Sequence, residues 1–287
     1  MVRRDHGRGA YALARSFSMK TKDFRDMVVA YYRREGRHAL PWRKTHDPYK
    51  ILVSEIMLQQ TQVDRVIPYF TRWMKKFPTP QKLAKASLAE VLTEWSGLGY
   101  NRRAKLLREC AKVIVERYGG AVPRDRDALV TLPGIGPYTA GAIRAFAFDE
   151  KEVFIETNIR AALIHHFFPK SKKVDDKKLL PLLSGCLTQV PSAREWYSAL
   201  MDYGSYLKKT NPNPSRRSRH HTRQSRFEGS LRQFRGIILR RLLNGPLEES
   251  ALLNVEVEGS YFLEQALRDL AHEGLIEQNG KKWTLAK

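Results

Sequence analysis

Two glutamates in apolar surroundings are the side chains of this sequence best suited to acid–base chemistry. Glu55 lies inside the apolar run Ile51–Leu58, and Glu156 follows the apolar segment 153–155. Burial would raise the pKa of Glu55 and suit it to donate a proton, while an ionised second carboxylate could stabilise an oxocarbenium-like sugar. The pair is typical of glycosidic bond hydrolysis. Two alternatives are that Glu55 is a surface glutamate of an amphipathic helix and that Glu156 is a helix cap.

Amide and hydroxyl side chains follow Glu55 directly, at Gln59, Gln60, Thr61 and Gln62. Such groups can hydrogen-bond base edges or fill the gap that remains when a nucleotide leaves the base stack. Their place at the end of an apolar helix indicates contact with nucleic acid.

A glycine-rich turn at residues 132–136 opens onto the helical run Pro137–Phe148. Gly134 and Gly136 would allow positive φ and expose successive amide groups, which form a seat for phosphate at the start of a helix. Gly97 and Gly99 form a similar turn, to which we assign the same role. An ordinary connection between two helices is the alternative.

The elements that must position these residues are helices. From Asp23 to Tyr206, apolar residues recur at helical spacing and prolines break the pattern, which predicts an all-α fold without a sheet. The predicted helices are Phe24–Arg37, Tyr49–Thr61, Val63–Lys76, Leu88–Ser96, Arg102–Tyr118, Arg126–Thr131, Pro137–Phe148, Asn158–Phe168, Asp175–Gln189 and Ala193–Leu207.

Four regions follow from the composition. Residues 1–20 are basic and expected to be disordered, 21–207 form the helical domain, and 208–229 form a basic linker. Residues 230–287 contain three short helical patterns and a hairpin with an Asn279-Gly280 turn, which is typical of a winged-helix domain.

The charge of the chain favours a polyanionic partner. Among 287 residues, Lys and Arg exceed Asp and Glu enough to give a net charge of +21 and a pI near 10.1. We expect Arg216, Arg217 and Arg219 of the linker to contact DNA phosphates, and a solvated charge run is the alternative. No apolar run approaches the roughly 18 residues of a membrane helix. With only Cys110 and Cys186, the chain has neither a disulfide framework nor a four-cysteine metal site. We expect the protein to be cytoplasmic and associated with the nucleoid. We also expect it to be a monomer.

An ordered series of motifs resembles the MutY-type adenine DNA glycosylases of the helix-hairpin-helix (HhH-GPD) base-excision repair superfamily. The motifs are Leu40-Pro41-Trp42-Arg43, Ser54-Glu55-Ile56-Met57-Leu58-Gln59-Gln60-Thr61-Gln62-Val63, Gly97-Leu98-Gly99-Tyr100, Leu132-Pro133-Gly134-Ile135-Gly136 and Met201-Asp202-Tyr203-Gly204. The series is more specific than any single motif. The resemblance implies a two-lobed helix-hairpin-helix fold and, as partner, double-stranded DNA with a mismatched or damaged base.

The resemblance also implies roles for individual residues. Glu55 would protonate the excised purine at N7 and then help to activate water, and Glu156 with Asn158 would stabilise the sugar cation. Further residues would line the base pocket or enter the duplex: Trp42, Arg43, Leu58 and Val63 at the base, Gln60 in the opened duplex, and Tyr100 as the wedge. From their place directly after Glu55, we also assign Gln59 and Thr61 to the base pocket or duplex wedge. Trp42, Leu58 and Val63 could equally be core residues, and Arg43 a surface charge.

Tyr138 stands where lyase members of the superfamily carry a Schiff-base lysine. A phenol cannot form that imine, so a monofunctional glycosylase that leaves an abasic site is expected. Mispaired adenine is the favoured target. The alternatives are a G·T or G·U mismatch pyrimidine glycosylase and a non-catalytic protein that binds DNA lesions.

Three departures from the family pattern concern a side chain, a cofactor and a domain. Glu156 replaces the usual aspartate, and residues 230–287 are too few for the nudix-like domain that reads 8-oxoguanine. The positions of the family's four cluster-binding cysteines fall on Lys208, Ser215, Ser218 and Gln224. We therefore expect no iron–sulfur cluster and no other cofactor, apart from a monovalent cation at the carbonyls of the 132–136 turn.

Overall fold

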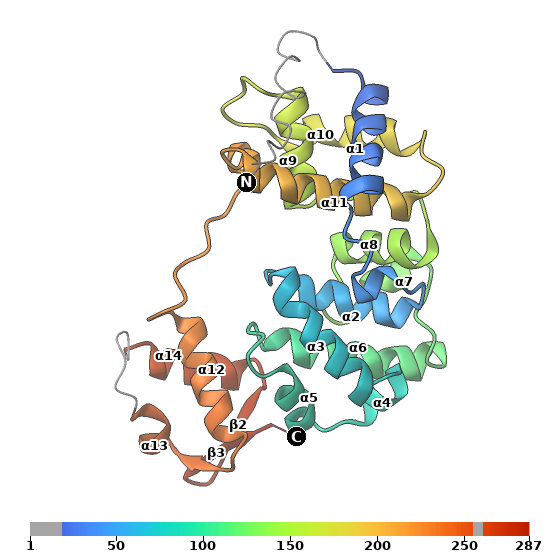
Figure 1. The fold of residues 1–287 in the computed structure, drawn as a ribbon. Coiled ribbons are helices and arrows are strands. Elements are labelled where there is room, and N and C mark those ends of the chain that lie inside the picture. Colours follow the sequence, from blue (N-terminus) through green and yellow to red (C-terminus); the bar gives the residue numbers. More distant parts are fainter. Residues whose placement is uncertain (1–18, 255–260, 287) are drawn as a thin grey trace, which may run out of the picture. The chain divides into compact units, whose positions relative to one another are not determined.

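The computed structural model describes residues 19–254 and 261–286, and these residues are mainly helical (Figure 1). The all-α prediction for the region from Asp23 to Tyr206 is confirmed. The elements of this region are α1 (Thr21–Glu35), η1 (Pro41–Arg43), α2 (Pro48–Leu58), α3 (Val63–Lys76), α4 (Pro80–Lys85), α5 (Leu88–Trp95), α6 (Arg102–Tyr118), α7 (Arg126–Val130), α8 (Pro137–Phe148), α9 (Thr157–Phe167), α10 (Asp176–Leu187) and α11 (Ala193–Thr210). Disorder is expected for residues 1–20. Of these, residues 1–18 lie outside the part of the chain that the structure describes.

The chain folds into two compact units made of interleaved segments. Unit 1 consists of Met1–Gly36, Ile155–Pro191 and Glu195–His221, and unit 2 consists of Arg37–Phe154, Ser192–Arg194 and Thr222–Lys287. Glu55 therefore belongs to unit 2 and Glu156 to unit 1. The predicted domain 21–207 supplies segments to both units.

In unit 2, α2 packs against α3, α6 and α8. Its sequence is apolar nearly all round, as expected for a helix with neighbours on several sides. Beside it, Trp73 lies with its ring edge on Phe77 and Trp95, and all three rings are buried. This packing fixes the helix that carries Glu55.

In unit 1, the core forms around Phe24 of α1. Its ring contacts Phe167 of α9 and Trp196 of α11 edge-on. A short helix that was not predicted, η2 (Pro214–Arg217), packs against α9, and Val174 pairs with Ser218 in a single parallel bridge. The basic segment after α11 is thus folded onto α9 at this point, whereas its composition alone had suggested a linker.

The described C-terminal residues of unit 2, 222–254 and 261–286, include three helices and a small antiparallel sheet. The elements are α12 (Leu231–Leu242), β1 (Leu247–Glu248), α13 (Glu249–Leu253), α14 (Phe262–His272), β2 (Ile276–Asn279) and β3 (Lys282–Leu285). The strand order is β1-β3-β2, and the predicted hairpin turn is present with Gly280 at φ 62°. These are the helices and the hairpin that the sequence indicated; their assignment as a winged-helix domain stays a prediction.

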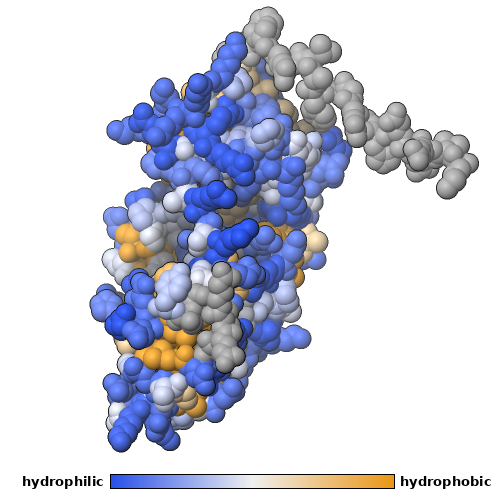
Figure 2. All heavy atoms as spheres, turned by 90° about the vertical axis from the view of Figure 1, so that its left-hand side faces the viewer, coloured by the Kyte–Doolittle hydropathy of each residue, from blue (hydrophilic) through white to orange (hydrophobic). Residues whose placement is uncertain are grey.

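One face of the molecule is mainly hydrophilic (Figure 2), in keeping with the high charge of the chain. Figure 2 shows hydrophilic residues over most of the face turned to the viewer, with small hydrophobic patches between them. Within the described residues, no helix is both long and apolar enough to cross a membrane.

Candidate active site

Glu55 is buried in the body of α2. Asp47 caps this helix by accepting hydrogen bonds from the amides of Tyr49 and Lys50, and Pro48 occupies the first helical position. Only 7% of Glu55 is exposed, and its neighbour Ser54 is 1% exposed. The alternative of a surface glutamate is therefore wrong, and Glu55 has the desolvated setting that a general acid needs.

The C-terminal end of α2 is held by Arg103 of α6, a residue that the sequence analysis did not select. Its guanidinium donates to the carbonyl oxygens of Ile56 (2.8 Å), Met57 (3.0 Å) and Gln59 (2.6 Å). It also donates to Thr61 Oγ1 at 3.1 Å and to the Gly99 carbonyl at 3.0 Å. One buried cation thereby ties the loop after Glu55 to the loop before α6.

Burial lowers the pKa of Arg103 to about 10, so the guanidinium remains charged at neutral pH. A signal for its position existed in the sequence. Arg103 shares the spacing of Leu107, Cys110 and Ile114, which form the buried face of α6. An arginine on an apolar helical face needs several acceptors, and the ends of two nearby segments supply them.

Two residues that the family resemblance assigns to duplex entry have left-handed backbone conformations. Gln60 has φ 55° and Tyr100 has φ 51°, in the region that favours glycine. Gln60 is exposed, and the Tyr100 hydroxyl accepts hydrogen bonds from Arg232, at 2.9 Å, and from Gln224. Strained backbone of this kind is concentrated at functional sites, and here the Arg103 contacts maintain it.

Other predicted pocket residues of unit 2 surround α2. Trp42 is buried against Phe70, and the carbonyl of Arg43 accepts from Arg194 at 2.8 Å. Gln59 Nε2 contacts Thr139 Oγ1 of α8 at 3.4 Å. Leu58 ends α2 and Val63 begins α3, both half-buried.

The predicted phosphate-binding turn lies between α7 and α8. Gly134 has φ 79°, and a Cβ there would lie 3.0 Å from Leu106 Cβ. Gly136 has φ −90°, so positive φ was wrong for this glycine; as the N-cap of α8 it has extended backbone, like most N-caps. Tyr138 follows in the first turn, half-buried, with its ring edge on Phe154.

In unit 1, Glu156 is the N-cap of α9, which confirms the helix-cap alternative. One carboxylate oxygen accepts from the amides of Asn158 (2.6 Å) and Ile159 (2.9 Å), and the other accepts from Asn158 Nδ2 at 3.2 Å. Burial raises the pKa of Glu156, while the hydrogen bonds from the amides of Asn158 and Ile159 act to lower it. These two hydrogen bonds from main-chain amides fix the position of the Glu156 carboxylate.

The motif glycine Gly204 explains how α11 approaches this cap. A Cβ at Gly204 would lie 2.0 Å from the carbonyl oxygen of Asn158, closer than any real contact. Glycine is therefore required here by the packing of α11 against the start of α9.

The three linker arginines differ in position. Arg216 is exposed, and Arg219, also exposed, pairs with Asp175 at 3.2 Å. Arg217 instead donates to carbonyl oxygens of unit 1, including that of Pro169 at 3.0 Å. Contact of these arginines with DNA phosphates stays a prediction.

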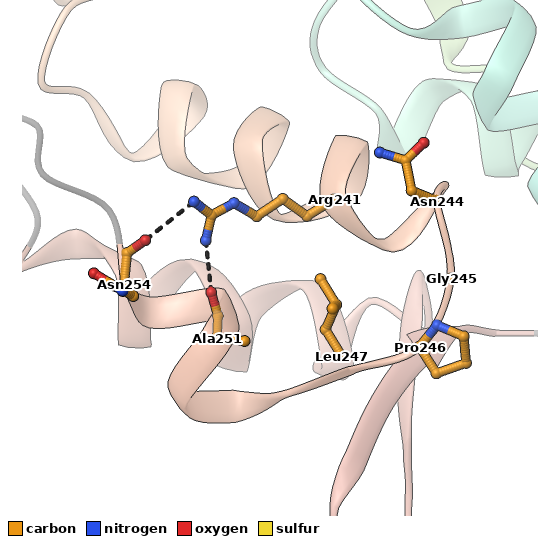
Figure 3. A pocket seen from close by; sticks show the side chains of 7 residues that line it. All are labelled: Arg241, Asn244, Gly245, Pro246, Leu247, Ala251 and Asn254. Carbon is orange, nitrogen blue, oxygen red and sulfur yellow. Dashed lines mark hydrogen bonds between the residues drawn. The ribbon is translucent and has the colours of Figure 1, made fainter.

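A cavity of about 460 Å³ in the C-terminal part of unit 2 is unsuited to catalysis (Figure 3). Arg241 reaches across it, and its guanidinium is already bound to the carbonyl oxygens of Ala251 (2.6 Å) and Asn254 (3.0 Å). Among the residues that the structure describes, the lining contains no carboxylate, histidine or cysteine. The lining residues are Arg241, Asn244, Gly245, Pro246, Leu247, Ala251 and Asn254.

Comparison with known proteins places this arrangement in a family. Residues 53–183 match the model of the HhH-GPD superfamily base excision DNA repair proteins. Over 261 residues the chain is 36% identical to an adenine DNA glycosylase of Mycolicibacterium smegmatis, which covers 85% of this chain and 89% of that protein. The chain belongs to the MutY-type branch of the HhH-GPD superfamily.

Other members of the superfamily match shorter parts. An adenine DNA glycosylase of Mycobacterium tuberculosis is 48% identical over 134 residues, which is 46% of this chain and 44% of that protein. The structure of a thermostable thymine-DNA glycosylase has a TM-score of 0.59 and 30% identity, covering 64% of this chain and 86% of that one. Endonuclease III in a non-covalent complex with DNA has a TM-score of 0.53 at 20% identity, which supports the HhH-GPD fold.

Proposed function

We propose that the protein is a monofunctional DNA glycosylase that removes mispaired adenine from double-stranded DNA and leaves an abasic site. The observation that carries the proposal is the buried Glu55, in a helix whose end is tied by Arg103 to the Tyr100 loop. Two relatives support adenine as the target, because both are named adenine DNA glycosylases. One matches 85% of this chain and the other matches 46%.

In the proposed reaction, the Glu55 carboxyl group donates its proton to N7 of the flipped adenine. The C1′–N9 bond then breaks, and its electron pair leaves with the base. The Glu156 carboxylate stabilises the resulting sugar cation, and water adds to C1′ while Glu55 takes back a proton. Tyr138 has no amine to form an imine with the sugar, so the strand is not cut.

The alternative of a G·T or G·U pyrimidine glycosylase draws support from the 30% identity to a thymine-DNA glycosylase. A protein that only binds lesions is the other alternative.

The test is product formation on duplexes with adenine opposite 8-oxoguanine, adenine opposite guanine, and thymine or uracil opposite guanine. Alkali then reveals abasic sites, and omission of alkali reveals strand cleavage by the protein itself. We expect product on the adenine duplexes, only after alkali. Glu55→Gln should lower the rate by about 10²- to 10⁴-fold, the usual contribution of a general acid.

Glu116→Gln, on the exposed face of α6, is the control and should retain full activity. Product only on the duplexes with thymine or uracil opposite guanine would favour the pyrimidine enzyme. Binding without product on every duplex would favour the lesion-binding protein, and full activity of Glu55→Gln would refute the mechanism.

A further inference from the structure

The segment that holds an iron–sulfur cluster in most MutY-type proteins has side chains unsuited to one. Ser215 and Ser218 are buried hydroxyls, and Ser215 Oγ donates to Asn213 Oδ1 at 2.7 Å. Cys110 and Cys186 belong to different units, and burial raises the pKa of their thiols to about 12 and about 11. Thiolates in a four-cysteine set are what the cluster requires, so these residues do not fit it.

The same segment is nevertheless tightly fastened to α9. Arg217 Nη1 donates to the carbonyl oxygens of Phe168, Pro169 and Ser171, and Nη2 donates to that of Ile164 at 3.4 Å. These acceptors are the last carbonyls of α9 and of the turn that follows it, where the helix dipole favours a cation.

Main-chain hydrogen bonds also join this segment to Val174. The amide of Val174 donates to the Arg217 carbonyl at 2.7 Å, and the amide of Arg219 donates to the Val174 carbonyl at 2.9 Å. The charge of Arg217 also lies close enough to lower the pKa of His165 at the end of α9, second to the effect of burial.

We propose that Arg217 fastens the 213–219 segment to α9 without a metal cluster. Four carbonyl oxygens around one guanidinium form a centre that needs no metal ligands. As a positioning residue, Arg217 presents the exposed Arg216 and Arg219 from a fixed backbone. That they contact DNA rests on the proposed function, whereas the fastening does not.

Hydrogen–deuterium exchange of the full chain without DNA tests the fastening. In Arg217→Ala, exchange in peptides that contain Val174 and Arg219 should rise about tenfold or more, because hydrogen bonds to a charged donor are lost. Arg216→Ala, in the same segment, is the matched control and should exchange like the parent chain. Arg217→Lys keeps the charge but cannot reach four acceptors, so its exchange should also rise.

The salt dependence of duplex binding separates fastening from phosphate contact. Arg217→Lys and Arg217→Ala should leave the slope of log K against log salt unchanged, while Arg216→Ala should reduce it by about one. Unchanged exchange in Arg217→Lys, or a slope reduced by about one in Arg217→Ala, would overturn the proposal. If only the Arg216 slope fails to change, the assignment of DNA contact is wrong and the fastening stands.

Discussion

Helices α2 and α9 are both eleven residues long and carry the two proposed catalytic carboxylates, but they hold them differently. Glu55 lies buried in the body of α2, a helix that packs against α3, α6 and α8. Glu156 precedes the first turn of α9 and is placed by main-chain amides. The first arrangement desolvates the acid, and the second holds a carboxyl oxygen with two fixed hydrogen bonds from main-chain amides.

The C-terminal ends of the two helices are alike, because each is bound by an arginine from another segment. Arg103 is 9% exposed and binds five backbone carbonyls besides Thr61, whereas Arg217 is half-buried and binds four. The more deeply buried cation should matter more for stability.

The strongest test of this difference is the removal of each guanidinium. Arg103→Ala should lower the free energy of unfolding by about 3 kcal/mol or more, because several buried carbonyls lose their donor. Arg217→Ala should cost about 1–2 kcal/mol, since its acceptors lie nearer to solvent. Urea denaturation measures both. Arg102→Ala, at the exposed neighbour of Arg103, should stay within about 0.5 kcal/mol of the parent, and an equally small effect of Arg103→Ala would remove the distinction.

A second test concerns the opposite end of α9. Gly204→Ala should cost about 1–3 kcal/mol, because the new methyl group must push the start of α9, and with it Glu156, away from α11. Gly185→Ala in α10 is the control: no atom lies within 4 Å of the added Cβ, so alanine should stabilise this helix slightly. Thermal unfolding compares them, and equal stability of the two variants would contradict the packing argument.

The smallest effect is expected from pH at the C-terminal end of α9. Burial, with a smaller effect of His165, lowers the pKa of His166 to about 4, and its Nε2 lies 2.7 Å from the Tyr203 hydroxyl. Between pH 6.5 and 4 the unfolded chain therefore binds a proton that the folded chain does not, so stability falls as pH falls. His166→Phe should remove about 1–2 kcal/mol of this loss.

The control for the pH test is His221→Gln, at an exposed histidine of unit 1. Its unfolding should follow the parent chain at every pH between 6.5 and 4. If His166→Phe has the same pH dependence as the parent chain, His166 does not stay neutral in the folded state.

Local patterns were sufficient for the helical class and for several helix bounds. Val63–Lys76, Arg102–Tyr118 and Pro137–Phe148 were predicted as observed, because apolar spacing and the residues that start or stop a helix lie within each segment. The predicted helix Tyr49–Thr61 ends at Leu58 instead. The carbonyl oxygens at the end of the helix accept hydrogen bonds from Arg103, which lies 44 residues after Gln59 in the sequence. A pattern of neighbouring residues cannot reveal so distant a partner.

By itself, the sequence determined which chemical groups are available: Glu55 in an apolar helix, Glu156 before another helix, a phenol at Tyr138, and too few cysteines for a cluster. These are properties of residue types and their neighbours, so they can be read along the chain.

Only the tertiary structure decided which acceptors the described arginines bind. Composition made Arg217 a candidate for phosphate contact and left Arg103 unnoticed, yet both bind carbonyl oxygens at helix ends. The physical reason is that a guanidinium binds whichever acceptors surround it, and the acceptors of Arg217 come from α9 and the turn after it, up to 53 residues away.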